Sequence, residues 1–323
     1  MVMAQSLFKA LKQQHSDVII DVLAPGWSRP LLERMPEVAG AIDMPVGHGR
    51  LELKTRWHLG RTLRRHHYDQ AILLPNSLKS ALVPFWAGIP LRTGWLGEMR
   101  YGLLNDARKL DKTRLTMTVQ RFVALAYSSD HGSIPEIPIP ELEVDEANAQ
   151  AARETFGLGK GERPVLALCP GAEYGPAKRW PEAYYGELAR GMIEEGWDVW
   201  LFGSGKDQPV CAEISHIAGD ACADLSGRTS LAQAVDLLSL ADAVVSNDSG
   251  LMHVAAALGR PLVALYGSSD PGFTPPLNDC SKVITLGLEC SPCFKRECPL
   301  GHLKCLRDIS VDQVRETLRE LWA

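Results

Sequence analysis

The sequence has no long hydrophobic run and no excess of positive charge. No apolar stretch approaches the ~20 residues that cross a bilayer, and we find no secretory signal in the first residues. The formal net charge is −5, so the broad basic field of a nucleic-acid-binding protein is lacking. Eight cysteines without an export signal indicate reduced thiols. We therefore expect a globular, cytoplasmic protein with no nucleic-acid partner, and its 323 residues suffice for two domains.

Two common nucleotide-binding motifs are also missing. No G-x-x-x-x-G-K-[ST] occurs, which excludes a P-loop. Gly203-Ser204-Gly205 follows a predicted strand, but Gln208 stands where G-x-G-x-x-G needs its third glycine. The motif is therefore incomplete, which excludes a dinucleotide-dependent dehydrogenase.

One stretch of the chain, Ala243–Gly259, predicts a buried strand, a polar turn and a helix of small residues. Asp248 and Ser249 stand where the helix needs N-cap acceptors, and Gly250 permits close approach of a ligand or backbone. In a parallel sheet this turn lies at the carboxyl edge of the strands, where ligands bind and helix amides favour an anion. A capped turn with no ligand is the alternative.

A second stretch, Leu166–Pro181, places a basic loop after another predicted strand. Lys178 and Arg179 suit a nucleotide diphosphate, the first as a point charge and the second as a planar fork. The alternative is a solvated basic loop in which Trp180 anchors the core.

Together, PGA followed by GPAKRWP in the second stretch and NDSGLMHVAAALG in the first resemble the ADP-heptose:lipopolysaccharide heptosyltransferases of glycosyltransferase family 9, and their type II branch most closely. The resemblance extends over nearly the whole chain. It implies an α/β protein of GT-B architecture, with two Rossmann-like domains whose parallel sheets face a cleft.

The alternation of predicted strands and helices supports two such domains. The proline-containing segment Ile134–Leu142 is typical of a linker. We place an acceptor-binding domain at residues 1–143 and an ADP-heptose-binding domain at residues 144–323. The last helix, Ser310–Trp322, is expected to pack back on the first domain, as it often does in GT-B enzymes.

The beginning of the chain departs from this pattern. Met1–Gln14 predicts a helix and Asp17–Ala24 a strand, whereas a doubly wound domain starts with a strand that lies in mid-sheet. We expect that the natural chain begins about a dozen residues earlier, or that this chain is impaired. The family opens with a strand and a Gly-Asp loop whose Asp is taken as the general base. We therefore expect the base upstream of Met1 and name none within this sequence.

The resemblance implies inverting transfer of L-glycero-D-manno-heptose from ADP-L-glycero-β-D-manno-heptose to the first heptose of the inner core in heptosyl-Kdo2-lipid A. Lys178 is the residue expected to stabilise the leaving diphosphate. No cofactor or metal is expected, because helix amides and Lys178 replace a metal and no D-x-D motif serves one. Asp207 matches an acidic position for the ribose, with a charge at a helix N-terminus as the alternative. The donor-binding residues are Gly171, Lys178, Arg179, Asp207, Asp248, Ser249, Gly250, Leu251 and His253.

The acceptor side is expected in the first domain. Arg92–Asn105 mixes cations and aromatic residues with two glycines and resembles the family's acceptor loop; a plain strand-to-helix connection is the alternative. The candidate acceptor-binding residues are Asn76, Ser77, Trp95, Glu98 and Arg100. For Asn76 and Ser77, a helix cap is an equally good explanation. A nearby basic group offers a peripheral contact with the inner membrane or a solvated face. Its members are Arg108, Lys109, Lys112 and Arg114.

Four cysteines follow one another as C-x2-C-x4-C-x6-C, at Cys290, Cys293, Cys298 and Cys305. The first spacing suits zinc, and four thiolates can close a structural site. The whole spacing is not that of a standard zinc ribbon, so free thiols or oxidisable pairs are the leading interpretation.

Three other functions remain open. A type I heptosyltransferase, or another ADP-sugar-binding GT-B protein, would share the donor site and differ in the acceptor loop. An epimerase or hydrolase of the same architecture would turn over without an acceptor. A truncated, impaired chain would bind the nucleotide sugar without catalysis.

Overall fold

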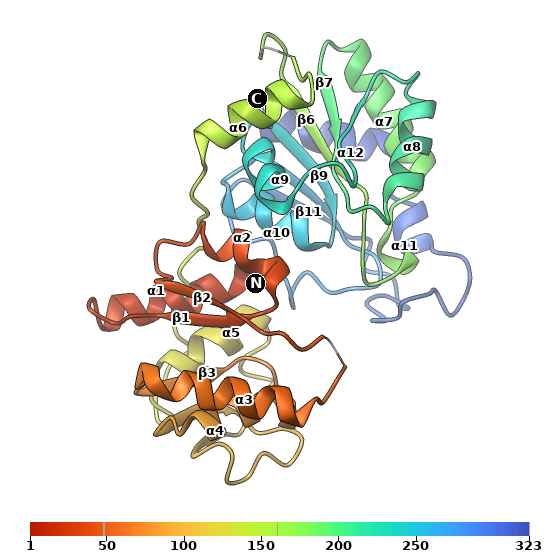
Figure 1. Cartoon of the computed structure of the whole chain (residues 1–323). Helices are drawn as coiled ribbons and strands as arrows, with labels where there is room; N and C mark the ends of the chain where they lie inside the picture. The colour runs from red at the N-terminus through yellow and green to blue at the C-terminus, as the bar shows by residue number, and fades with distance from the viewer. Residues whose placement is uncertain (48, 160, 323) are drawn as a thin grey trace. The chain divides into compact units, whose positions relative to one another are not determined.

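The computed structural model describes residues 1–47, 49–159 and 161–322 (Figure 1). The chain divides into two compact units, Met3–Pro138 (unit 1) and Ile139–Ala323 (unit 2). In the described part of the chain, no helix has the length and apolar character to cross a membrane.

Unit 1 contains two separate parallel sheets, ordered β1-β2 and β3-β4-β5. Its strands are β1 (Asp21–Ala24), β2 (Gly40–Asp43), β3 (Gln70–Leu73), β4 (Leu91–Trp95) and β5 (Asp106–Arg108). Its helices are α1 (Gln5–Gln14), α2 (Arg29–Leu32), α3 (Leu53–Leu63), α4 (Leu78–Ala87) and α5 (Thr118–Val123).

The two sheets of unit 1 share one apolar layer. Leu23 of β1 and Ile42 of β2 pack against the buried Leu63 of α3 and Val83 of α4. Within the described residues, β1 pairs only with β2 and β3 only with β4, so one edge of β1 and one edge of β3 carry no strand partner. The predicted helix at the start of the chain is present as α1, which packs on α5.

Unit 2 contains one six-stranded parallel sheet in the order β11-β10-β9-β6-β7-β8. Its strands are β6 (Val165–Cys169), β7 (Asp198–Leu201), β8 (Ala223–Asp224), β9 (Ala243–Asn247), β10 (Leu262–Leu265) and β11 (Ser281–Ile284). Its helices are α6 (Glu146–Thr155), α7 (Glu182–Glu194), α8 (Gln208–Ile217), α9 (Leu231–Leu238), α10 (Gly250–Ala257), α11 (Lys304–Arg307) and α12 (Val311–Trp322).

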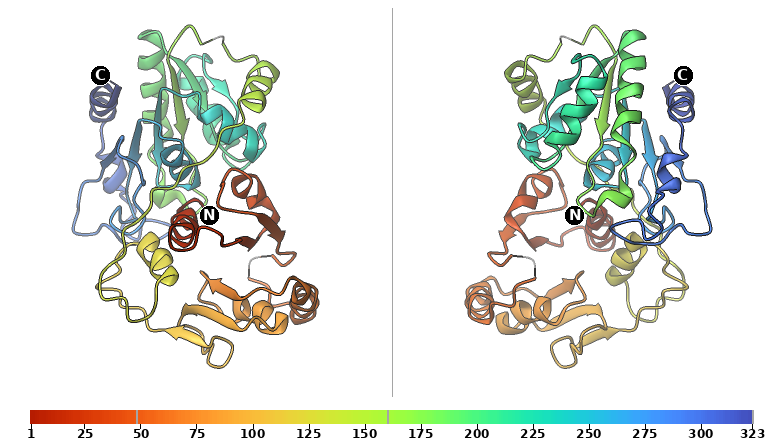
Figure 2. Two further views of the ribbon diagram at one scale, coloured as in Figure 1. Left: turned by 90° about the vertical axis from the view of Figure 1, so that its left-hand side faces the viewer. Right: turned by 90° about the vertical axis from the view of Figure 1, so that its right-hand side faces the viewer.

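Helices cover both faces of this sheet (Figure 2). Helices α7, α8 and α12 lie on one face, and α6, α9 and α10 lie on the other. Every residue of β6, β9 and β10 is buried, as expected for parallel strands between two helical layers. Val314 and Leu318 of α12 are part of the hydrophobic core of unit 2, together with buried residues of these strands. The predicted α/β class with parallel sheets is confirmed.

Candidate functional site

The polar residues predicted for nucleotide binding gather at the carboxyl end of the sheet of unit 2. The loops after β6, β7, β9 and β10 all leave this edge, because all four strands are parallel. In a doubly wound sheet this edge is where ligands bind.

An ion pair joins two of these loops. Lys178 lies in the loop after β6, and Asp248 lies in the loop after β9. Lys178 Nζ donates a short hydrogen bond to Asp248 Oδ2. The side chain of Asp248 is 6% exposed and that of Lys178 is 17% exposed, so water screens the pair only partly. Lys178 Nζ also lies 5.1 Å from the centre of the Tyr174 ring. The structure therefore places one cation and one carboxylate together at the predicted diphosphate position.

Asn247 fixes the spacing of the two loops. This residue is fully buried. Its Oδ1 accepts from the Trp180 backbone N–H at 3.0 Å, and its Nδ2 donates to the Pro170 carbonyl at 2.7 Å. Trp180 is itself buried and donates from Nε1 to the Ile309 carbonyl at 3.0 Å. Trp180 therefore anchors the core, and Asn247 ties the basic loop to the end of β9.

The turn after β9 has the predicted helix cap. Ser249 is the N-cap of α10, and its Oγ accepts from the Met252 backbone N–H at 3.4 Å. A Cβ placed on Gly250 would meet no described atom within 4 Å, so this position opens onto free space. Leu251, in the first turn, is half-buried. The backbone N–H groups at the N-terminus of α10 favour an anion.

His253 lies in the first turn of α10, beside the ion pair. Burial lowers the pKa of its imidazole to about 4, the charge of Asp248 opposes this shift, and the charge of Lys178 adds to it. His253 is therefore neutral at pH 7 and can donate one N–H without adding positive charge.

Asp207 faces the loop after β6, but its carboxylate already accepts hydrogen bonds within its own turn. Asp207 Oδ2 accepts from the Ser204 backbone N–H at 2.8 Å and from Ser204 Oγ at 2.7 Å. A Cβ on Gly171 would lie 2.8 Å from this carboxylate, so the glycine is needed for close packing of the two loops. Within the described residues, Arg179 Nε is buried and has no hydrogen-bond partner.

Two hydroxyl groups enlarge this site. Ser268 and Ser269 follow β10, and both side-chain oxygens are buried without a hydrogen-bond partner among the described residues. The Ser268 backbone N–H donates to the Ala177 carbonyl at 3.4 Å, next to Lys178. Unsatisfied buried hydroxyls are uncommon, and a ligand would satisfy them. From the sequence, the place of this loop directly after a predicted strand favours contact of Ser268 and Ser269 with phosphate or base, and an ordinary turn is the alternative.

The predicted acceptor residues gather in unit 1 where β3 and β4 end. Glu98 Oε2 accepts from the Leu78 backbone N–H at 2.8 Å and so caps α4, and Asn76 Oδ1 accepts from Arg100 Nη2 at 3.3 Å. Ser77 is the N-cap residue of α4, without a side-chain cap bond. Asn76 and Glu98 are exposed and Ser77 is half-buried, so all three are accessible.

Arg100 differs from these residues because it is fully buried. Its guanidinium donates to the Pro75 carbonyl at 2.8 Å, to Ser80 Oγ at 3.3 Å and to the Trp95 carbonyl, in addition to Asn76. These contacts clamp the loop from inside and leave the group no surface to offer an acceptor. The cation–sugar contact expected from the sequence is therefore replaced by a structural role.

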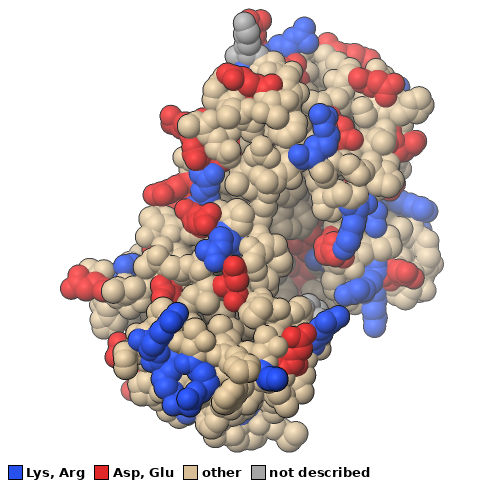
Figure 3. Space-filling model, in the orientation of Figure 1, with Lys and Arg blue, Asp and Glu red and all other residues tan. Residues whose placement is uncertain are grey.

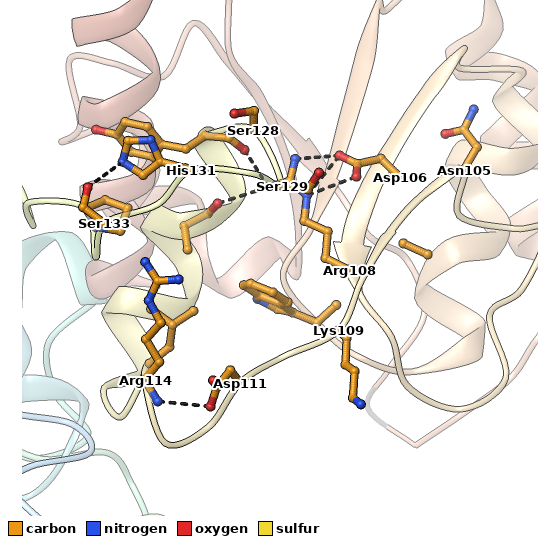
Figure 4. Close-up of a pocket in the computed structure, with 16 residues that line it drawn as sticks. Asn105, Asp106, Arg108, Lys109, Asp111, Arg114, Ser128, Ser129, His131 and Ser133 are labelled. Atoms are coloured by element: carbon orange, nitrogen blue, oxygen red, sulfur yellow. Dashed lines mark hydrogen bonds and ion pairs between the residues drawn. The ribbon is translucent and has the colours of Figure 1, made fainter.

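Trp95 is buried and donates from Nε1 to the Arg121 carbonyl at 2.9 Å. It borders a polar pocket of about 420 Å³ within unit 1, between the segment after β5 and residues 124–135 (Figure 4). Arg108 is paired with Asp106 at 2.6 Å and also donates to two carbonyls, so it is not part of a solvated basic face. Lys109 and Arg114 supply the exposed cations of the pocket.

Comparisons with known proteins identify the family. The sequence model of glycosyltransferase family 9 (heptosyltransferase) matches residues 56–304. Lipopolysaccharide heptosyltransferase 2 of Salmonella typhimurium is 51% identical over 99% of this chain and 94% of its own length. Lipooligosaccharide heptosyltransferase 2 of Haemophilus influenzae is 48% identical, over 100% of this chain and 96% of its own.

A solved structure agrees with these relatives. The structure of E. coli ADP-heptose lps heptosyltransferase II superposes with a TM-score of 0.89 and 48% identity, and the match covers 100% of this chain and 95% of that chain. The resemblance, the GT-B fold class and the glycosyltransferase activity expected from the sequence are confirmed. The chain belongs to glycosyltransferase family 9, the heptosyltransferases.

Proposed function

We propose that the protein transfers L-glycero-D-manno-heptose, with inversion, from ADP-L-glycero-β-D-manno-heptose to the first heptose of heptosyl-Kdo2-lipid A. The observation that carries this proposal is the Lys178–Asp248 pair beside the amino end of α10, in a chain with 51% identity to a lipopolysaccharide heptosyltransferase 2. Under this proposal residues 144–323 bind the donor and residues 1–143 bind the acceptor.

In the proposed reaction, an acceptor hydroxyl attacks the anomeric carbon from the face opposite ADP. The bond from that carbon to the diphosphate breaks, and negative charge grows on the leaving oxygen. Lys178 and the amides near Gly250 stabilise that charge, which is the usual role of preorganised donors. Neutral His253 donates a hydrogen bond to phosphate or to a heptose hydroxyl. Asp207, Gly171 and Arg179 border the nucleotide, and no residue of this sequence is assigned as the general base.

The acceptor side of the proposal rests on Asn76, Ser77 and Glu98, which are accessible at the ends of β3 and β4. Their amide, hydroxyl and carboxylate groups suit sugar hydroxyls. The buried side chains of Arg100 and Trp95 hold this loop in place through the hydrogen bonds described above.

We also propose peripheral contact with the cytoplasmic face of the inner membrane, through the outer face of α3. Leu53 is 51% exposed and Trp57 is 43% exposed. Four exposed cations accompany them, and residues 53–68 contain no acidic side chain. The cations are Lys54, Arg61, Arg64 and Arg65. Figure 3 shows basic side chains gathered over this helix. Exposed apolar groups beside cations are typical of a helix that lies on anionic lipid.

The decisive experiment measures ADP release from ADP-heptose, with and without heptosyl-Kdo2-lipid A, beside calorimetric titration with ADP-heptose. We expect saturable donor binding, and ADP release that depends on the acceptor. Release at the same rate without acceptor would indicate a hydrolase, and absence of donor binding would overturn the assignment of the site. Acceptor that lacks the first heptose, Kdo2-lipid A, serves as the specificity control.

The membrane contact has its own test, sedimentation with vesicles that contain anionic phospholipid. We expect the doubly substituted Arg61→Gln, Arg65→Gln protein to bind more weakly, because each cation near an anionic surface contributes about 1 kcal/mol. The matched control is Lys109→Gln, Arg114→Gln, at the pocket of Figure 4. Equal loss in the control would show that the contact is not through α3.

A further inference from the structure

The loop after β6 carries an aromatic ring beside the lysine of the proposed donor site. Lys178 Nζ lies 5.1 Å from the centre of the Tyr174 ring, within the distance at which the face of a ring attracts a cation. The same ammonium donates a hydrogen bond to Asp248 Oδ2. Lys178 therefore has two partners, a charged carboxylate and an uncharged ring. Because lysine carries its charge on a flexible stem, each of these contacts limits where the ammonium can stand.

The ring of Tyr174 is itself held through its hydroxyl group. This hydroxyl donates to the Phe294 carbonyl at 2.6 Å, in the segment between β11 and α11 (Figure 1). The Phe294 backbone N–H donates in turn to the Ser268 carbonyl at 2.7 Å, in the loop after β10. The guanidinium of Arg296 also lies near the ring, with its Cζ 5.4 Å from the ring centre. A segment 120 positions further along the chain therefore fixes the side chain of Tyr174.

The backbone between the ring and the lysine is fixed against the same segments. The Ala177 backbone N–H donates to the Arg296 carbonyl at 3.0 Å, and the Ala177 carbonyl accepts from the Ser268 backbone N–H at 3.4 Å. Gly175 has φ +152°, and a Cβ there would lie 2.6 Å from the Arg296 carbonyl oxygen. The two backbones therefore touch at a position that requires glycine. The stretch that joins the ring to the ammonium is held along its length.

The segment that receives these bonds also contains three of the four clustered cysteines. Cys290, Cys293 and Cys298 precede α11 and Cys305 lies on it, and all four are free thiols. In the part of the chain that the structure describes, no three Cys, His, Asp or Glu side chains stand together as ligands of a metal ion. The contacts that hold this segment to Tyr174 in the structure are the hydrogen bonds given above.

We propose that Tyr174 is a positioning residue for the transfer reaction, and that its ring keeps the Lys178 ammonium turned toward the leaving diphosphate. This inference rests on the proposed function of Lys178. The ion pair alone draws the ammonium toward the buried carboxylate of Asp248, whereas the ring attracts it from a second direction without adding a negative charge. Donors that are in place before charge develops lower the barrier most effectively. Tyr174 therefore acts on kcat, through Lys178, and has little effect on the KM for the donor.

The first test detects the contact itself by NMR and needs no turnover. Lysine is labelled with carbon-13 at Cε, and the Lys178 signal is identified by its loss in Lys178→Arg. Because an aromatic ring shifts the signals of nearby protons, Tyr174→Leu should move the Lys178 signal and Tyr174→Phe should leave it nearly in place. The matched control is Phe156→Leu, which removes a ring 5.5 Å from Arg228 Cζ elsewhere in unit 2 and should not move the signal. An unmoved Lys178 signal in Tyr174→Leu would overturn the proposal.

The second test measures the kinetics of acceptor-dependent ADP release. We expect Tyr174→Leu to lower kcat about tenfold and to leave the KM for ADP-heptose within about twofold of the parent's, since a misplaced catalytic group slows the chemical step. Tyr174→Phe keeps the ring and loses only the hydroxyl contact, so its kcat should lie between those of the parent and Tyr174→Leu. Phe156→Leu should match the parent. An unchanged kcat in Tyr174→Leu, or a change in KM alone, would contradict the positioning role.

A double-mutant cycle shows whether Tyr174 acts through Lys178. The background is Lys178→Met, Asp248→Asn, in which neither partner of the ion pair is left as an unpaired charge. In this background Tyr174→Leu should change kcat by less than about twofold, because the ammonium that the ring would position is gone. A further loss of about tenfold would show that the ring acts independently of the lysine, and the proposal would fail. A parent protein that shows the NMR contact but no acceptor-dependent turnover would overturn the proposed function, and the role in transfer with it, while the contact stands.

Discussion

The Lys178–Asp248 pair allows stability and activity to be separated by two substitutions. Lys178→Met leaves the Asp248 carboxylate, 6% exposed, without its cation. Removing one partner of a buried pair costs about 3 to 5 kcal/mol, and the 17% exposure of Lys178 puts this site at the lower end, about 3 kcal/mol. The combined Lys178→Met, Asp248→Asn protein carries neither charge. We expect its free energy of unfolding to lie within about 1 kcal/mol of the parent's.

Activity should follow the lysine alone. If Lys178 stabilises the leaving diphosphate, its loss lowers kcat by about 100-fold, and the second substitution does not recover it. The free energy of unfolding is followed by urea titration of tryptophan fluorescence, and activity by acceptor-dependent ADP release. Recovery of both stability and activity in the double variant would show that Lys178 only neutralises Asp248. A Lys178→Met protein as stable as the parent would refute the burial argument.

Three further predictions concern single positions. Asn247→Ala should destabilise unit 2 by about 3 kcal/mol, because the buried Trp180 N–H and Pro170 carbonyl lose their partner; urea titration checks this, and a cost under about 1 kcal/mol would contradict it. Burial holds the pKa of His253 near 4, against 6.5 for a free imidazole, so the unfolded chain binds the proton first and stability falls as pH drops from 6.5 to 4. His253→Gln should flatten that slope in melting temperatures taken across this range, and an unchanged slope would count against it. Arg100→Lys should destabilise unit 1 by about 2 kcal/mol, since an ammonium cannot serve the same planar set of acceptors; thermal unfolding measures it.

Much of unit 2 could be predicted because its signals are local. Fully buried strands such as Val165–Cys169 are unbroken apolar runs, and Ser249 stands directly before the small residues of α10. In unit 1 the local signals were less reliable. The predicted strand Asp17–Ala24 contains β1 only in its second half, Asp21–Ala24, since the preceding residues lie outside the ladder with β2.

The site residues show the same division. Strand order predicts that Lys178 and Asp248 lie near the same edge of the sheet. Their direct pairing depends on a contact between residues 70 positions apart, which strand order does not predict. Asn247 was not singled out from the sequence, because its two partners lie 67 and 77 positions away. The sequence predicts that Arg100 binds the acceptor sugar, because arginines on loops are usually exposed. Its burial among carbonyls is decided by packing and cannot be deduced from residue type.

The resting ion pair also constrains how a diphosphate can bind. At the proposed diphosphate position a carboxylate would repel an incoming anion. Lys178 neutralises Asp248, and the two remaining N–H donors of Lys178 are free for the ligand. With His253 neutral at pH 7, the local charge of this group is close to zero. Oriented dipoles, namely the amides at the start of α10 and the Ser268 and Ser269 hydroxyls, then add to the donors that Lys178 and Arg179 offer the anion. Dipoles of this kind favour the transition state, in which charge on the leaving oxygen is greatest, more than the bound donor.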